Sequence, residues 1–414
     1  MRETVRFLKG NVRFLAFGFA LTFFSSFGQT FFLSLFAGEI REQFSLSHGT
    51  WGLVYSLATL ASGLTVGRLG AGIDRMSLPR YTALVCGALV VSAFGFAAVT
   101  SIATLAIAVF AMRLTGQGLM GHVAMTSMAR YFERERGRAI SIALLGFPVG
   151  EATLPPLAVG LKATLGWRGT WLLVGGALAI VLVPLALALL RGHDRRHEEW
   201  AARAAAPASA RDGAATARDW TRAEVLRDPR FWLVLPAAVT CGFLLTGLFF
   251  HQVHLTEAKG WSLEWYALGF SGFAVSQIVC TLGAGPLVDR YGARRLMAVF
   301  LGPIAAGLVV LATRSETISA FLYLALAGVS SGSSRTIAGA FWAETYGTKH
   351  LGSIRAMLSA MFVVATAVAP VSMGALIDRG VSMETIAWLG FAWTILAAGL
   401  AAFAVRGAGN RSSA

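Results

Sequence analysis

The stretch GPLVDR at residues 285–290 repeats the pattern of GAGIDR at residues 70–75, and the two stretches are 215 residues apart (285 − 70 = 215). The same offset aligns further residues across the two parts of the chain. A constant offset over so many residues is a signature of repeat architectures. It indicates that the chain is built from two related halves. The further aligned pairs are Tyr131 with Tyr346, Gly137 with Gly352, and Pro155 with Pro370.

The composition places both halves in a membrane. Of the 414 residues, 56% are hydrophobic and only 14% are charged, with a mean hydropathy of +0.65, whereas soluble domains are about 25% charged. Apolar runs long enough to cross a bilayer as helices recur along the chain. We therefore expect an all-α integral membrane protein with twelve transmembrane helices, at about residues 12–37, 51–71, 80–99, 102–129, 138–161, 169–190, 229–254, 264–286, 295–313, 317–343, 351–376 and 384–405.

A long polar stretch between the sixth and seventh runs divides the chain. We expect a six-helix bundle over residues 1–190, a cytoplasmic linker over 191–228 and a second six-helix bundle over 229–414. The two bundles should be pseudo-symmetric, because they carry the repeated pattern. The first apolar run is too long for a signal peptide and lacks a small-residue cleavage site, so we interpret it as an uncleaved helix.

The distribution of positive charge predicts the orientation. The formal net charge is +14, from 35 Lys and Arg against 21 Asp and Glu. If both termini are cytoplasmic, 27 of the basic residues lie on that side and six on the other, in line with the positive-inside rule. We expect a bacterial-type inner membrane, with the lipid bilayer rather than nucleic acid as the partner of the basic loops, and a monomer.

Several kinds of site are not indicated by the sequence. Cys86, Cys241 and Cys280 are widely spaced within apolar runs, so neither a metal site nor a disulfide framework is predicted. The glycines of Gly116–Gly121 fit a dinucleotide fingerprint but lie inside a membrane span, where small residues favour close helix packing. No Walker A sequence is present. We therefore expect no cofactor and no enzymatic activity.

The longer stretch GPLVDRYGARR, residues 285–295, resembles the cytoplasmic signature of the major facilitator superfamily (MFS), which joins helix 2 to helix 3 and helix 8 to helix 9. The first copy has Ser77 where the second has Gly292. The resemblance implies the MFS fold and rocker-switch alternating access between the two bundles. It also implies that Asp74 pairs with Arg130 when the cytoplasmic side is shut, although these charges could serve topology alone. The gating residues expected on this basis are Asp74, Arg75, Arg130, Asp289, Arg290 and Arg294.

Two motifs resemble one branch of that superfamily. Arg113–Gly118, and Tyr131–Ala139 together with Gly166–Arg168, are similar to motifs of the monocarboxylate and oxalate–formate transporters. That branch has a cation in helix 8, whereas residues 265–283 of this chain carry no charge, and its animal members have a lysine in helix 1, where this chain offers Gln29 as its large polar group.

Ionisable residues inside membrane spans are costly and therefore suggest function. Arg335 and His122 could hold a carboxylate, although Arg335 could instead bind helix carbonyls or pair with Glu344. Glu151 could carry a proton or could bond to Arg113. His251 and His254 are better explained by a position in an outer vestibule. The expected substrate-binding residues are Arg335, His122, Gln29, Trp342 and Tyr55, and the expected proton-coupling residues are Glu151, His122 and Arg113.

The function predicted is secondary active transport of a small solute, with a small organic anion favoured and with coupling to a proton or counter-substrate gradient. One alternative is proton-coupled efflux of a drug or other hydrophobic compound. An alternative of another class is a non-transporting MFS-like sensor or assembly factor. The sequence leaves the substrate, the direction of transport and the coupling ion open.

Overall fold

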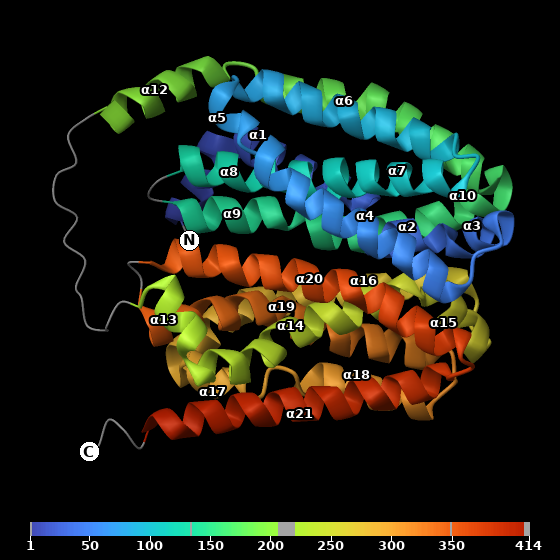
Figure 1. Ribbon diagram of the computed structural model, residues 1–414. Coiled ribbons are helices and arrows are strands. Elements are labelled where there is room, and N and C mark those ends of the chain that lie inside the picture. Colours follow the sequence, from blue (N-terminus) through green and yellow to red (C-terminus); the bar gives the residue numbers. More distant parts are fainter. Residues whose placement is uncertain (1, 133–134, 206–219, 348–349, 410–414) are drawn as a thin grey trace. The chain divides into compact units, whose positions relative to one another are not determined.

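The computed structural model describes residues 2–132, 135–205, 220–347 and 350–409, and helices are its only regular elements in these ranges (Figure 1). The expected all-α fold is confirmed. The middle of the expected linker, residues 206–219, and Glu133 and Arg134 of the Tyr131–Ala139 motif lie outside the described residues. Two shorter helices lie between the halves, α12 (His193–Ala205) and α13 (Arg222–Arg227).

The first half contains six helical segments of membrane length, most of them interrupted. Short 3-10 segments, η1 (Ser25–Gly28) and η2 (Ser34–Phe36), and π segments, η3 (Arg113–Met120) and η4 (Leu178–Leu182), mark the interruptions. In order, the segments are α1 (Arg2–Phe24) with α2 (Thr30–Leu33) and α3 (Ala37–Phe44); α4 (His48–Leu69), followed by the single turn α5 (Gly72–Arg75); α6 (Leu78–Ala97); α7 (Ile102–Met112) with α8 (Gly121–Tyr131); α9 (Arg136–Leu144) with the start of α10 (Gly146–Ala177); and the rest of α10 with α11 (Val183–Leu189).

The second half repeats this arrangement with fewer interruptions. Its segments are α14 (Pro229–Phe250) with α15 (Gln252–Lys259); α16 (Leu263–Tyr291); α17 (Ala293–Met297) with α18 (Gly302–Thr313); α19 (Ile318–Tyr346); α20 (Leu351–Asp378); and α21 (Met383–Gly409). The short helix after the first break occupies the same repeat position in both halves, since α3 shifted by 215 residues is α15 (37 + 215 = 252; 44 + 215 = 259).

Nine stretches of the described residues are long and apolar enough to span a bilayer. One of these, Arg136–Leu189, contains two segments that meet at Gly166, where φ is +66° and ψ is 172°. This backbone conformation favours glycine, so the chain can turn between the fifth and sixth segments there. Adding α4 and α19, which are long enough but more polar, gives the expected twelve (9 + 1 + 2 = 12).

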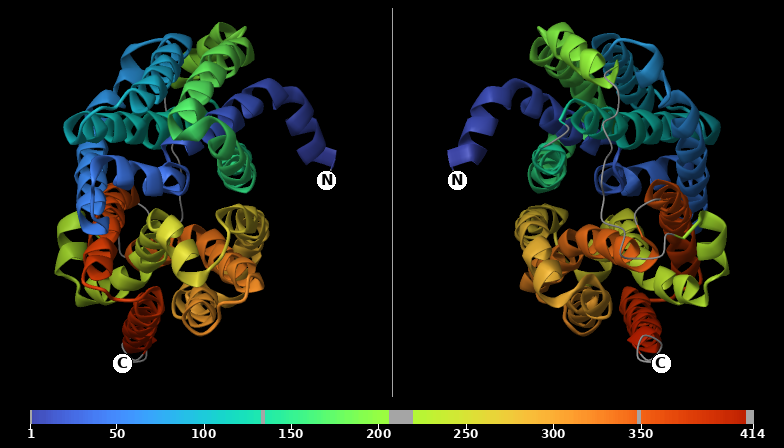
Figure 2. Two further views of the ribbon diagram at one scale, coloured as in Figure 1. Left: turned by 90° about the vertical axis from the view of Figure 1, so that its right-hand side faces the viewer. Right: turned by 90° about the vertical axis from the view of Figure 1, so that its left-hand side faces the viewer.

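The contacts divide the chain into two compact units. The first comprises the described parts of Met1–Phe36 and Leu57–Gly213, and the second those of Ala37–Ser56 and Ala214–Ala414. Helix α4 therefore crosses from one unit to the other at Ser56. The end-on views in Figure 2 show that the long helices within each unit run side by side as a bundle.

Each unit has an aromatic core and an apolar outer surface. In the first unit the Trp171 ring lies 4.7 Å from the Phe96 ring and 5.5 Å from the Phe32 ring, centroid to centroid, which holds α2 against α6 and α10. Large aliphatic side chains such as Leu64 and Ile180 are 78% and 77% exposed. Exposed apolar surface of this kind suits contact with lipid rather than water.

Candidate functional site

The first helical segment is broken at the centre of the first unit. Helix α1 ends at Phe24, the 3-10 turn of η1 follows, and Gln29 takes an extended conformation (φ −82°, ψ 156°) before α2 begins. The Ser25 hydroxyl donates to the Thr22 carbonyl at 2.7 Å, a local bond that competes with continuous helix. Non-helical backbone within a membrane span is typical of a transport site that lines a cavity.

The break packs against a second irregularity, the π segment η3. A Cβ placed on Gly28 would lie 2.7 Å from the Gly116 Cα, so the two backbones approach more closely than any side chain would allow. Arg113 begins η3, is 2% exposed, and donates through Nη1 to the Gly28 carbonyl (2.9 Å) and through Nε to Thr59 Oγ1 (3.2 Å). Arg113 therefore stabilises the broken backbone of helix 1.

The start of α10 completes this site. A Cβ on Gly150 would lie 3.1 Å from the Ser26 Cβ, so α10 lies directly against η1. Glu151 is the next residue and is half-buried, as are Gln29 beside the break and Gln117 in η3. The break thus brings the predicted residues Gln29, Arg113 and Glu151 onto elements that pack together. Gln117 was not predicted, because nothing in the sequence signals a π segment.

His122 has a clear contact within the first unit. Its Nε2 lies 3.1 Å from the carbonyl oxygen of Gly70, at hydrogen-bonding distance, and this contact ties α8 to the end of α4. The predicted contact between His122 and substrate stays a prediction.

The two copies of the signature differ in structure. Asp74 and Arg130 form an ion pair, as predicted, and Arg130 also donates through Nη1 to the Ile73 carbonyl at 3.2 Å. The guanidinium carbon of Arg130 lies 5.5 Å from the centre of the Trp200 ring of α12. Arg75 lines a cavity of about 530 Å³ next to this pair. The gating role of these residues stays a prediction.

In the second copy Asp289 is exposed and forms no ion pair with another described residue. The position equivalent to Arg130 is Thr345, which cannot supply a charge (130 + 215 = 345). Arg290 lies 5.2 Å from the Tyr291 ring, while Arg294 reaches the Glu344 carbonyl oxygen at 3.4 Å. The turn itself explains the change from Ser77 to Gly292, since φ is −61° at Ser77 and +78° at Gly292.

Arg335 is exposed on α19 in the second unit, close enough to Cys241 of α14 to act on it electrostatically. One turn further along α19, a Cβ on Gly339 would lie 3.8 Å from Nη2 of Arg355, an exposed residue of α20. Glu344, the alternative partner of Arg335, accepts a hydrogen bond from the backbone N–H of Ala293 at 3.2 Å. Two guanidinium groups therefore lie near the same stretch of α19.

Trp342 and Tyr55 lie in packed surroundings. Trp342 is 3% exposed and stacks on Tyr346 at 5.9 Å between ring centroids, with Phe231 at 5.5 Å. Tyr55 is fully buried, and its ring lies 4.6 Å from that of Phe250. Both contacts are within the second unit, and the assignment of these two residues to substrate binding stays a prediction.

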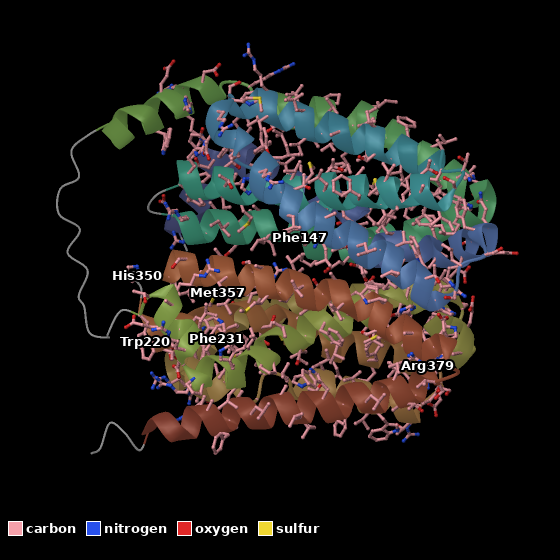
Figure 3. All side chains as sticks on the ribbon, viewed as in Figure 1. Phe147, Trp220, Phe231, His350, Met357 and Arg379 are labelled. Atoms are coloured by element: carbon pink, nitrogen blue, oxygen red, sulfur yellow. The ribbon has the colours of Figure 1, made fainter. Side chains whose placement is uncertain are left out.

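A polar cluster lies at the C-terminal end of α20. Figure 3 labels Arg379 at this end and His350 at the opposite end. The ring of His48 lies 4.4 Å from that of His254 and 5.7 Å from that of His251. His251 is 3% exposed, and its Nε2 lies 2.9 Å from the Pro370 carbonyl oxygen. In the part of the chain that the structure describes, no three His, Cys, Asp or Glu residues are placed to hold a metal ion.

Comparisons with known proteins agree with this architecture. A family model described as Major Facilitator Superfamily matches residues 18–275 and 238–412. The oxalate:formate antiporter of Oxalobacter formigenes is 21% identical over 281 residues, which cover 68% of this chain and 64% of that protein. Monocarboxylate transporter 11 of Homo sapiens is 30% identical over 166 residues, which cover 40% of this chain and 35% of that protein. The chain thus matches less than two thirds of either relative.

Solved structures share the fold at low sequence identity. A bacterial homolog of the human lysosomal transporter Spinster, in an inward-facing and unoccupied conformation, superimposes with a TM-score of 0.67 at 16% identity, covering 96% of this chain and 97% of its own. The nucleoside transporter NupG superimposes with a TM-score of 0.68 at 15% identity, covering 96% and 98%. At these identities the likeness shows the fold alone.

Proposed function

Because the chain belongs to the Major Facilitator Superfamily and is an integral membrane transporter of small solutes, not an enzyme, we propose that its substrate is a small organic anion. The relatives described above include an oxalate:formate antiporter and a monocarboxylate transporter, whose names refer to carboxylates. Alternating access between two bundles, with a site near the middle of the membrane, is the mechanism we infer.

The observation that carries this proposal is the pair of exposed guanidinium groups on neighbouring helices of the second unit. Arg335 and the Gly339 position beside Arg355 are four residues apart on α19, which is about 6 Å along the helix. Arginines in a membrane span face a cavity or the protein interior far more often than lipid. Their planar forks of donors suit a carboxylate, which can accept two bonds from each.

The broken helix of the first unit presents its own set of polar groups, which we propose takes part in transport. Gln29 and Gln117 offer amide groups within that unit. Glu151, half-buried on α10 next to the break, is the group we propose for proton coupling. A half-buried carboxyl can gain or lose a proton with limited access to water. Its protonation can therefore be linked to binding of the solute. Exchange for a second anion is the alternative source of energy.

We further propose that the protein lies in a bacterial inner membrane, works as a monomer and has both termini in the cytoplasm. The 27 basic residues on the side of the termini, against six on the other, support this orientation. The polar cluster around His48 then faces the outside of the cell.

A ligand screen on the purified protein tests the substrate class. Oxalate, formate, lactate and pyruvate are added singly, and the thermal unfolding temperature is measured; an anion at about 100 times its Kd should stabilise the protein by about 2.7 kcal/mol. Arg335→Ala should abolish this stabilisation. Arg314→Ala, which removes an exposed arginine paired with Glu316, is the matched control and should retain it.

Two outcomes would count against the proposal. Stabilisation by an anion that persists in Arg335→Ala would remove Arg335 from the site. Stabilisation by hydrophobic cations such as ethidium, with no response to any of the four anions, would favour the efflux alternative.

A further inference from the structure

A segment of the first half is built into the second unit. Residues 37–56 precede the first signature in the sequence, yet they pack with the C-terminal helices. Within this packing, α3 meets α15, its own repeat equivalent: a Cβ on Gly38 would lie 3.5 Å from Val253 Cγ1, and these two residues are also 215 positions apart (38 + 215 = 253). The outer parts of the two first helices therefore contact each other at equivalent positions.

Asp378, at the last turn of α20, holds the start of α4. Its Oδ1 accepts a hydrogen bond from the backbone N–H of His48 at 2.9 Å, and its Oδ2 accepts from the backbone N–H of Gly49 at 2.8 Å and from the Ser47 hydroxyl at 2.6 Å. A carboxylate at a helix N-terminus satisfies donors that have no partner within the helix and interacts favourably with the helix dipole. A side chain from the second half thus caps a helix of the first half.

The backbones of α4 and α20 also approach closely at this place. A Cβ on Gly52 would lie 2.6 Å from the Pro370 carbonyl oxygen, and a Cβ on Gly374 would lie 2.7 Å from the His48 carbonyl carbon. Neither helix could come so near with a larger residue at these positions. The polar cap and the glycine contact together close this end of α4 against α20, and we refer to Ser47, His48, Gly49, Gly52 and Asp378 as the outer clasp.

The repeat shows that the outer clasp has no counterpart in the second half. Ser262 stands at the position of Ser47 (47 + 215 = 262) and caps α16 by accepting from Trp265 N–H at 3.1 Å, as Ser47 accepts from Thr50 N–H at 3.1 Å. The position equivalent to Asp378 is Ala163, which cannot accept a side-chain hydrogen bond (378 − 215 = 163). The capping carboxylate is therefore present at the start of α4 and has no equivalent at the start of α16.

Charged and titratable groups surround His48 from each element packed against it. Arg41 lies on α3, Asp378 on α20, and His251, His254 and Glu257 at or after the break between α14 and α15; all of them act electrostatically on His48 or on its neighbours. His48 and His254 are close enough that a proton on one ring disfavours a proton on the other. A positive charge on His48 is therefore unfavourable while the clasp is closed.

Burial, followed by the charges of Arg41 and the two other histidines, lowers the pKa of His48 to about 3, while Asp378 opposes this shift. A histidine that opens to water regains a pKa of about 6.5. Because the closed state binds the proton less well than the open state, acidification below about pH 6.5 favours opening. For one such group, going from about pH 7.5 to about pH 5.5 shifts the ratio of open to closed about tenfold.

We propose that the outer clasp is a proton-operated gate: it is shut when His48 is neutral, and it opens when a proton from the outer side enters the cluster formed by His48, His251, His254 and Asp378. Asp378 provides the bond that holds the gate, and His48 provides its pH dependence. In a proton-driven transporter this gate would admit solute from the acidic side. The gate depends on the proposed alternating access but on no particular substrate.

Distance measurements between spin labels test this gate without any ligand. Exposed Gln43 on α3 and Thr385 on α21 are replaced by cysteine and labelled in a Cys280→Ser background, since Cys86 and Cys241 are buried. The full chain is reconstituted in nanodiscs, and distances are recorded at about pH 7.5 and about pH 5.5. At the higher pH the proposal expects a single short distance between the labels. At the lower pH the population with a long distance, relative to the population with a short distance, should rise roughly tenfold.

Three variants decide the outcome. Asp378→Asn should show the long distance at both pH values, and His48→Gln should keep the short distance with most of the pH response lost. Ser262→Ala, at the equivalent helix start, should behave as the parent protein does. A pH-independent distance in the parent, or an Asp378→Asn protein that matches the parent while its thermal unfolding is cooperative, would overturn the proposal. Substrate screens have no bearing on either result, so this gate and the proposed anion specificity can fail separately.

Discussion

The start of α4 and the start of α16 occupy the same position in the two repeats, and they are held differently. Both begin with a serine that caps its own helix, Ser47 or Ser262. Only the start of α4 is also bound by a carboxylate from a distant helix and pressed against a glycine contact. A shared helix start therefore does not make a gate; the difference comes from Asp378, which α20 places beside α4, and from glycine at residue 52, where α16 has Ala267 (52 + 215 = 267).

Among the differences between the two helix starts, the glycine contact at Gly52 should give the largest effect on transport when it is substituted. Gly52→Val should place a branched side chain against the Pro370 backbone, which cannot move aside as a flexible side chain can. Overpacking of this kind costs about 1–3 kcal/mol, which corresponds to about a fivefold to 150-fold loss of the closed state. Transport in proteoliposomes should fall by about fivefold or more.

Gly67→Ala is the matched control for this substitution, because it lies on the same helix with nothing within 4 Å of the added Cβ. It should transport as well as the parent and gain up to about 1 kcal/mol from better helix propensity. Normal transport by Gly52→Val would show that the close approach of α4 and α20 is not needed for the transport cycle.

The signature turns offer an intermediate test on the other side of the membrane. Asp74 is paired with Arg130, whereas Asp289 has no ion pair among the described residues. Asp74→Asn should therefore reduce transport by several-fold, and Asp289→Asn by less, because loss of a partly exposed ion pair is worth about 1 kcal/mol or less. Initial rates of uptake measure both. Equal losses in the two variants would mean that the Asp74–Arg130 pair contributes nothing specific.

The smallest effect is expected at the two serines. Ser47→Ala removes a helix cap and a bond to Asp378, whereas Ser262→Ala removes a cap alone. Loss of a cap costs about 0.5–2 kcal/mol, and Ser47→Ala should exceed Ser262→Ala by about 0.5–1.5 kcal/mol, the net value of one hydrogen bond. The thermal unfolding temperatures of the two variants measure this difference. Identical shifts would indicate that the bond to Asp378 does not stabilise the protein.

Much of the fold could be predicted from the sequence, because hydropathy and the 215-residue offset both report on whole helices. The break at Gln29 could not, since the first apolar run continues through it without a change in composition. Its cause is tertiary: Gly28 and Gly116 meet across two helices that are distant in the sequence. The π segment after Arg113 escaped prediction for the same reason.

The candidate site was predicted in part. Ionisable residues in apolar runs indicated Arg335, Glu151 and Arg113, whose roles stay predictions, whereas the ion pair between Asp74 and Arg130, expected from the resemblance to the superfamily, is present. The outer clasp was missed because Asp378 lies at the end of a span, where an acidic residue is unremarkable. One signal was available: Ser47 and Ser262 match across the repeat, whereas Asp378 aligns with Ala163. Departures from an internal repeat can therefore point to candidate functional residues.

Counterflow in proteoliposomes tests the central claim, exchange of small organic anions, most directly. Vesicles are loaded with unlabelled oxalate or lactate and diluted into a trace of the same anion in labelled form. The account predicts a transient accumulation of label above its outside concentration with at least one of these anions, abolished in Arg335→Ala and retained in Arg314→Ala. Absence of accumulation with every anion in the panel, from protein that unfolds cooperatively and moves ethidium instead, would contradict it.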